Sequence, residues 1–344
     1  MADPTVVELQ QQLQGLTEQL SGLHVHEEND ESSQTKWFTI KLSSSRVTVK
    51  NATEVWLGND PLKALILNLE ASEKLSNKVN IPDVNEYEGE ASLSIPKVPF
   101  VKRQVKERDP HFIGISEVKN KNDRAEIQSF LNRKGFGTKT FDFGGEILVH
   151  GWKTSEYVID NDAGNEPTDG HGFRYIWTRL KRKDDENKKF ILVTCHMPKK
   201  NTTSEPELLQ DSWTSLMDFI RNEQNDDVPI LLMGDTNAKW AAAGRRDSWT
   251  LQRFLSLGNE PAGKRFPHLA LDENHGNPAT TIGGSFIDNF IFFYKDGENH
   301  EDFTKNYCVD YHRLGWTSHH VLVFKFNRGL LGLEEPTNNS SQDF

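Results

Sequence analysis

The sequence is poor in cysteine and in positive charge, and both shortages limit the functions open to it. Its 344 residues include two cysteines, Cys195 and Cys308, too few for a disulfide framework. We therefore expect a reducing, intracellular compartment, either cytoplasm or nucleus. Lysine and arginine number 40 against 51 acidic residues, a net charge of −11. Proteins that hold nucleic acid by bulk electrostatics carry the opposite sign, so a polyanion would need a local basic surface or a metal ion.

Long apolar runs are also lacking. No stretch approaches the ~18 apolar residues that a membrane-spanning helix needs. The first residues have neither the basic head nor the apolar core of a secretory signal. We therefore expect no membrane association. Aromatic residues, in contrast, are plentiful, with 8 Trp, 20 Phe and 6 Tyr. They are enough for a packed core, which excludes wholesale disorder.

The N-terminal residues predict a helix separate from the main domain. Leucines recur there at alternating spacings of four and three, at Leu9, Leu13, Leu16, Leu20 and Leu23. This rhythm is typical of a coiled-coil seam, but it covers only about two heptads. The helix either mediates self-association or binding of a protein partner, or it packs on its own domain. Polar residues 26–35 predict a linker. The expected organisation is a helical extension and linker (1–35), one domain (36–327) and a flexible tail (328–344).

Short apolar segments alternate with helical patterns along the domain. Nine segments have the continuous apolar character of strands covered on both faces: 37–40, 64–67, 112–115, 146–149, 174–177, 190–193, 229–232, 290–293 and 321–324. Apolar periodicity predicts helices over 124–133, 207–221 and 248–257. Residues 181–189 predict an exposed hairpin, and the proline-containing, acidic stretch 71–110 predicts a surface insertion. This mixture predicts an α/β sandwich of layered sheets with outer helices.

Polar and titratable residues repeatedly stand at the ends of these predicted strands. They are Asn68, Glu70, Glu117, His196, Asp235, Asn237, Asp288, His319 and His320. Each of them alone is explained more simply as a turn residue or a cap. Carboxylates and imidazoles are costly to desolvate singly, however, so several of them at strand ends predict a shared polar cleft.

Six segments, taken in order, resemble the motifs of the endonuclease/exonuclease/phosphatase family, whose members include deoxyribonuclease I. The segments are Asn68-Leu69-Glu70, Ile115-Ser116-Glu117-Val118, Thr194-Cys195-His196-Met197-Pro198, Gly234-Asp235-Thr236-Asn237, Phe286-Ile287-Asp288-Asn289-Phe290-Ile291 and Thr317-Ser318-His319-His320-Val321. Gly-Asp-x-Asn alone is a weak signal, but six motifs in the family's order are a specific one. The resemblance covers about residues 64–326.

The resemblance implies a four-layer α/β sandwich, with two mostly antiparallel β-sheets flanked by helices. It also implies a divalent-metal-dependent phosphodiester hydrolase, an endonuclease acting on DNA or RNA. Its catalytic residues would be His196, Asp235, Asn237, Asp288 and His320. Among these, Asp288 would orient His320. Apart from the resemblance, Glu146, which follows Gly144 and Gly145, is a candidate to hold His196. Its Mg²⁺ would be bound around Asn68, Glu70, Glu117 and His319.

One departure from the family concerns the metal site. The family places Asp immediately before its final His, and His319 stands there in this sequence. Imidazole is a poor ligand for Mg²⁺ and a better one for Mn²⁺. Either the ion binds more weakly, or the ion changes, or catalysis is lost.

The substrate is predicted from basic and aromatic residues near the presumed cleft. Arg174, Trp240 and Arg245 would contact a nucleic-acid substrate, since basic loops with aromatics suit its backbone and bases. Two alternatives stay open at this point. The domain is a weakened or inactive binding and assembly module, or it is a phosphatase or phosphodiesterase of a small or lipid phosphoester.

Overall fold

The structure is a computed structural model of the chain. It describes residues 25–28, 37–40, 45–50, 57–69, 97–143, 145–160, 174–198, 206–223, 228–237, 265–269, 280, 287–295, 306–313 and 319–333. The predicted N-terminal helix and its role in self-association lie outside these ranges, and so does the predicted helix 248–257. Among the helices within them, none is both long and apolar enough to span a bilayer.

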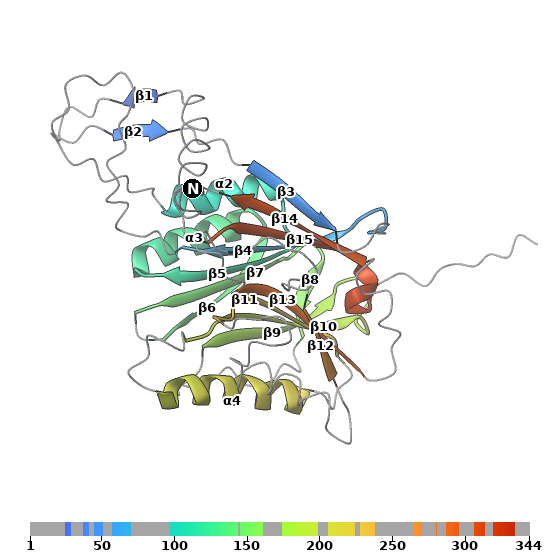
Figure 1. Cartoon of the computed structure of the whole chain (residues 1–344). Coiled ribbons are helices and arrows are strands. Elements are labelled where there is room, and N and C mark those ends of the chain that lie inside the picture. Colours follow the sequence, from blue (N-terminus) through green and yellow to red (C-terminus); the bar gives the residue numbers. More distant parts are fainter. Residues whose placement is uncertain are drawn as a thin grey trace, which may run out of the picture.

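Two large sheets form the centre of the domain (Figure 1). The first has seven strands, in the order β3 (Ser45–Lys50), β14 (Tyr307–Arg313), β15 (Val321–Phe326), β4 (Leu62–Asn68), β5 (Phe112–Val118), β7 (Ile147–Lys153) and β6 (Phe136–Asp142). The second has six, in the order β12 (Arg265–Leu269), β13 (Asp288–Lys295), β11 (Ile230–Asp235), β10 (Lys189–His196), β9 (Tyr175–Arg182) and β8 (Tyr157–Ile159).

Each large sheet is antiparallel except for one parallel pair, β4–β5 in the first and β10–β11 in the second. These four strands are buried along almost their whole length, because both of their faces are covered. A further two-stranded sheet pairs β1 (Val25–Glu28) with β2 (Trp37–Ile40). Its first strand occupies part of the stretch that we predicted to be a linker.

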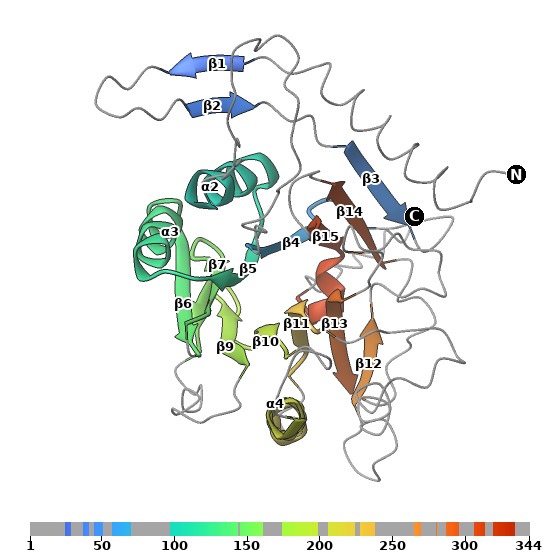
Figure 2. The ribbon, with the colours of Figure 1, turned by 60° about the vertical axis from the view of Figure 1, so that its left-hand side comes forward.

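Helices cover the outer faces of both sheets. The turned view in Figure 2 shows α2 (Lys97–Arg108) and α3 (Lys121–Arg133) on one side, and α4 (Pro206–Glu223) on the opposite side. Three apolar clusters fill the spaces between the layers. Phe112 and Phe190 join the two sheets, with ring centroids 5.2 Å apart. Val101 of α2 and Trp213 of α4 belong to the two outer clusters. The four predicted layers are therefore present.

Most of the predicted elements are confirmed, and two predictions are corrected. All nine predicted strands and the hairpin at 181–189 are present. The supposed insertion 71–110, however, ends in helix α2, which buries Val98, Val101 and Val105 on the first sheet. The supposed tail begins with a 3-10 turn, Arg328–Leu331, whose leucines are buried. The domain therefore extends at least to Leu333.

A buried histidine links the two sheets. His150 of β7 is fully buried, and its Nε2 lies 2.7 Å from Oγ1 of Thr178 on β9. Its Nδ1 lies 3.4 Å from Oγ1 of Thr194 on β10. Burial, assisted by the charge of Lys139, lowers the pKa of His150 to about 3. The ring is therefore neutral in the folded protein at every ordinary pH.

This histidine predicts a loss of stability in mild acid. Between its ordinary pKa of 6.5 and about 3, the unfolded chain binds a proton at His150 and the folded chain does not. The free energy of unfolding should fall by up to about 1.4 kcal/mol per pH unit as the pH is lowered through this window. Urea unfolding at several pH values measures this slope, with His150→Gln as control. A slope unchanged in the variant would contradict the prediction.

Candidate active site

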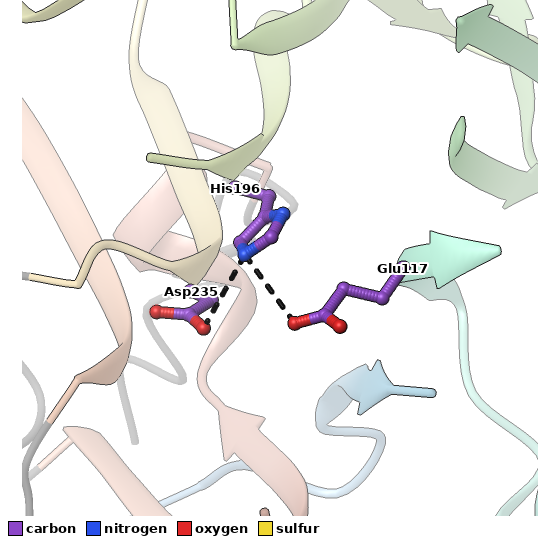
Figure 3. Close-up of side chains that lie close together, drawn as sticks. All are labelled: Glu117, His196 and Asp235. Atoms are coloured by element: carbon purple, nitrogen blue, oxygen red, sulfur yellow. Dashed lines mark ion pairs between the residues drawn. The ribbon is translucent and has the colours of Figure 1, made fainter. Parts of the chain in front are cut away.

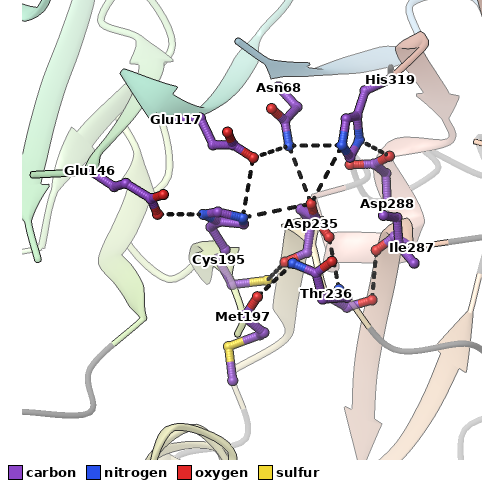
Figure 4. Close-up of polar contacts among 12 residues, drawn as sticks. Asn68, Glu117, Glu146, Cys195, Met197, Asp235, Thr236, Ile287, Asp288 and His319 are labelled. Atoms are coloured by element: carbon purple, nitrogen blue, oxygen red, sulfur yellow. Dashed lines mark hydrogen bonds and ion pairs between the residues drawn. The ribbon is translucent and has the colours of Figure 1, made fainter. Parts of the chain in front are cut away.

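Six predicted site residues meet at one edge of the sandwich because of the directions of their strands. The parallel pairs β4–β5 and β10–β11 end at this edge, and the antiparallel strands β13 and β15 begin there. The side chains that meet are Asn68, Glu117, His196, Asp235, Asp288 and His319. All six are buried. Figure 4 labels five of them, all but His196, in one network of polar contacts, and Figure 3 shows His196 beside Glu117 and Asp235.

The backbone at Glu117 is distorted. Its φ is +58°, which is uncommon for a residue with a side chain. The pairing of β5 with β7 also shifts register between Ile115 and Val118, as at a β-bulge. Bulges re-aim side chains, and a left-handed backbone costs about 1–3 kcal/mol. The side chain of Glu117, which leaves the strand at this distortion, contacts Asn68 and His196 through its carboxylate.

Asn68 lies at the centre of the network. Its Nδ2 donates to Oε1 of Glu117 at 3.1 Å and to Oδ2 of Asp235 at 3.2 Å, and it lies 3.3 Å from Nε2 of His319. An amide donates to anions without adding charge. Asn68 therefore holds two carboxylates together beside the ring of His319 (Figure 4).

His196 lies between three carboxylates. Figure 3 shows its Nε2 facing Oε1 of Glu117, at 3.4 Å, and Oδ2 of Asp235, at 3.7 Å. Its Nδ1 lies 3.2 Å from Oε2 of Glu146, which confirms the predicted contact between Glu146 and His196. Burial opposes charging of the ring, but these carboxylates together raise the pKa of His196 above its ordinary value. The site therefore favours the imidazolium form of His196.

Arg174, which we predicted to bind substrate, contacts groups of the protein itself. Its Nη1 lies 3.6 Å from Oε2 of Glu146, and its guanidinium lies 4.4 Å from the centre of the Phe143 ring. Its side chain is 21% exposed. Arg174 thus supports the carboxylate that holds His196. Phe143 belongs to none of the six motifs, so the local sequence does not mark it as a site residue.

The pairing of Asp288 differs from the prediction. His319 donates from Nδ1 to Oδ2 of Asp288 at 2.7 Å, so the predicted pair of Asp288 with His320 is wrong. Successive side chains near the start of β15 point to opposite sides, so only one of the two neighbouring histidines faces Asp288. His320 is also buried, and its backbone N–H donates to the carbonyl of Thr280.

The buried charges shift one another's pKa values. Burial, reinforced by the nearby charge of Asp288, raises the pKa of Asp235 to about 7, although His196 and His319 oppose the shift. Burial alone would lower the pKa of His319, but the carboxylates of Asp288, Asp235 and Glu117 raise it to about 9. The network therefore contains a carboxyl group that titrates near neutrality beside a positively charged ring.

Comparisons with known proteins give matches to solved structures. No family model matches the sequence, and no curated protein matches it significantly. ANGEL2, a 2′,3′-cyclic phosphatase, matches with a TM-score of 0.51 at 13% identity, over 83% of this chain and 98% of that chain. The 3′ phosphatase NExo from Neisseria, bound to a product DNA hairpin, matches with a TM-score of 0.50 at 14% identity, over 77% and 99% of the two chains. Both belong to the endonuclease/exonuclease/phosphatase superfamily.

The chain has the DNase I-like fold of that superfamily. This confirms the predicted sandwich of two mostly antiparallel sheets flanked by helices. Within that fold, Asp288 of β13 pairs with His319, at the start of β15. Which divalent metal binds, Mg²⁺ or Mn²⁺, stays a prediction.

A DNase I-like fold implies a divalent cation, and the residues present fit one. Glu117, His196 and Asp235 each offer a ligand atom, and these atoms lie within 4.8 Å of one another. Asp235, Asp288 and His319 form a second such group. Within the described part of the chain, Oδ1 of Asp288 is buried and accepts no hydrogen bond. A cation would offset the repulsion between these crowded carboxylates.

The remaining predicted residues divide into two groups. Asn237 lies beside the network, where its Nδ2 donates to the carbonyl of Met197 at 2.6 Å and its backbone N–H donates to Oδ1 of Asp235 at 2.8 Å. Its amide nitrogen is therefore used within the protein. Glu70, Trp240 and Arg245 lie outside the described residues.

Proposed function

We propose that this chain is a divalent-metal-dependent phosphodiester hydrolase, an endonuclease acting on DNA or RNA. The observation that carries the proposal is the convergence of six buried acids, amides and imidazoles in one contact network at the edge of a DNase I-like sandwich. Burying such groups together costs free energy, and function commonly explains that cost. Both described cysteines are free and buried, which is compatible with the intracellular location we expect.

The geometry supports separate roles for the acid and base groups. Asp235 would accept the proton of the attacking water, because its carboxylate lies between His196 and His319. His319, held by Asp288, would bring its positively charged ring next to a phosphoryl oxygen and stabilise the negative charge there. His196, held by Glu146, would donate a proton to the leaving oxygen.

The metal belongs beside Glu117. Its carboxylate and the amide oxygen of Asn68 are the hard oxygen ligands that Mg²⁺ prefers, and Glu70 stays a predicted third ligand. When bound, Mg²⁺ would neutralise charge on the phosphate. Asn68 would also keep Glu117 in place, since its Nδ2 already donates to Oε1 of Glu117.

The activity test uses a panel of phosphoesters. ANGEL2 and NExo are a 2′,3′-cyclic phosphatase and a 3′ phosphatase, so strand ends belong in the panel beside internal phosphodiesters. The panel holds plasmid DNA, single-stranded DNA and RNA, oligonucleotides with 3′-phosphate or 2′,3′-cyclic phosphate ends, and small and lipid phosphoesters. We expect polynucleotides to be cleaved with Mg²⁺, with the activity abolished by EDTA. Turnover of the small or lipid esters alone would favour the phosphatase alternative, and no turnover with Mg²⁺ or Mn²⁺ would favour the binding module.

Two neighbouring histidines provide a matched pair of variants. His319→Ala should lower kcat by about 10²–10⁴-fold, because it removes the positively charged imidazole ring that Asp288 holds. His320→Ala should lower kcat much less, since its backbone bond to Thr280 remains. Both side chains are buried, so thermal unfolding of both variants controls for general damage. A larger loss in His320→Ala would contradict the assignment of His319.

A further inference from the structure

A single buried threonine connects the two segments that carry Asp288 and His319. Thr280 is fully buried. Its hydroxyl oxygen accepts hydrogen bonds from the backbone N–H groups of Ile287 and Asp288, both at 3.1 Å. Its carbonyl accepts the backbone N–H of His320 at 2.9 Å.

These three bonds fix two pieces of backbone relative to each other. Asp288 begins β13 in the six-stranded sheet, whereas His319 precedes β15 in the seven-stranded sheet. The two strands lie in different sheets, so their own ladders do not set the distance between them. Thr280 bonds to the backbone of Asp288 and to the residue next to His319. Thr280 therefore links the backbone on both sides of the 2.7 Å bond between the Asp288 and His319 side chains.

We propose that Thr280 is a positioning residue that holds Asp288 against His319. Thr280 acts through the pair and need not touch the substrate. The inference rests on the proposed function, in which this pair places positive charge on the phosphate. Catalytic groups must be held to within about 0.5 Å, and a displacement of about 1 Å can cost 10²-fold in rate.

The hydroxyl provides the first test. Thr280→Val keeps the shape of the side chain but removes the acceptor, whereas Thr280→Ser keeps the acceptor. We expect Thr280→Val to lower kcat about 10- to 100-fold with KM nearly unchanged, and Thr280→Ser to restore most of the loss. Equal kcat in the Val variant and the wild type would overturn the proposal. If the Val variant does not fold, Thr280→Ala takes its place.

A double-mutant cycle separates positioning from general stability. If Thr280 acts through Asp288, then adding Thr280→Val to Asp288→Ala should change kcat by less than about twofold, because the acceptor of the His319 bond is already gone. Losses that multiply would show that Thr280 acts elsewhere and would overturn the proposal.

A spectroscopic measurement judges Thr280 independently of activity. The ring ¹⁵N resonances of His319 should shift in Thr280→Val and stay near the wild-type values in Thr280→Ser. If the wild-type protein hydrolyses nothing, the proposed function fails, and this measurement still decides whether Thr280 positions the pair. Unshifted resonances in the Val variant would overturn the positioning role.

Discussion

Asp235→Asn is expected to lower kcat by about 10²–10⁴-fold while leaving the protein folded. Oδ1 of Asp235 accepts the backbone N–H of Asn237, and Oδ2 accepts Nδ2 of Asn68. An asparagine fits the same space but cannot take a proton from water, so the loss should fall on kcat.

The same substitution should separate activity from stability. Burial raises the pKa of Asp235 to about 7, so the ionised carboxylate is disfavoured in the folded protein. This cost grows as the pH rises from the ordinary value of 3.8 through 7. Asparagine removes the buried charge, but its NH₂ group must face one of the two donors, the backbone N–H of Asn237 or Nδ2 of Asn68. The hydrogen bond lost in this way costs about 1–3 kcal/mol. At high pH, removing the buried charge changes the free energy of unfolding more than losing this hydrogen bond does.

The measurement compares thermal unfolding in EDTA at pH 5 and pH 8. We expect the Tm of Asp235→Asn, relative to wild type, to be higher at pH 8 than at pH 5. The proposed role of Asp235 would be rejected if the variant kept wild-type kcat. A Tm that is lower than wild type by the same amount at both pH values would reject the effect of the buried charge.

The strands and their polar ends could be predicted from the sequence because burial on both faces leaves a local signal. A run of apolar residues such as 230–233, followed by Asp235, indicates both a buried strand and the polar residue at its end. Helix α2 gave a weaker signal. Its first turn contains Pro99, which a helix tolerates there, and its basic residues separate the buried Val98, Val101 and Val105. Pro96 and Pro99 therefore suggested a loop where a core helix begins.

The partners of the site residues could not be predicted in the same way. His319 and His320 are chemically identical neighbours, and the choice between them depends on which one faces Asp288. Thr280 belongs to no apolar run in the sequence. It accepts hydrogen bonds from the backbone N–H groups of Asp288 and His320, which belong to segments of different sheets. Such contacts depend on tertiary structure, which the local sequence does not encode.

Gly234 is the position where a single methyl group should do the greatest damage to the fold. It precedes Asp235 at the end of β11 and pairs with Cys195 of β10. Its φ is +133°, a conformation that L side chains rarely adopt. A Cβ added there would lie 2.2 Å from the carbonyl oxygen of Cys195, which is backbone and cannot swing away. The close approach of β10 and β11 thus requires glycine.

Gly234→Ala should therefore lower the free energy of unfolding by about 3–5 kcal/mol, through backbone strain and overlap between the two strands. For a domain of this size the Tm should fall by about 10 °C. Gly135→Ala is the matched control: its φ is +79°, but nothing lies within 4 Å of the added Cβ. The control carries the backbone cost alone, about 1 kcal/mol or slightly more. Equal losses in the two variants would show that contact with Cys195 does not limit this position. A larger loss for Gly234→Ala, with the catalytic defect that a displaced Asp235 would cause, would show that one glycine sets both the strand pairing and the site.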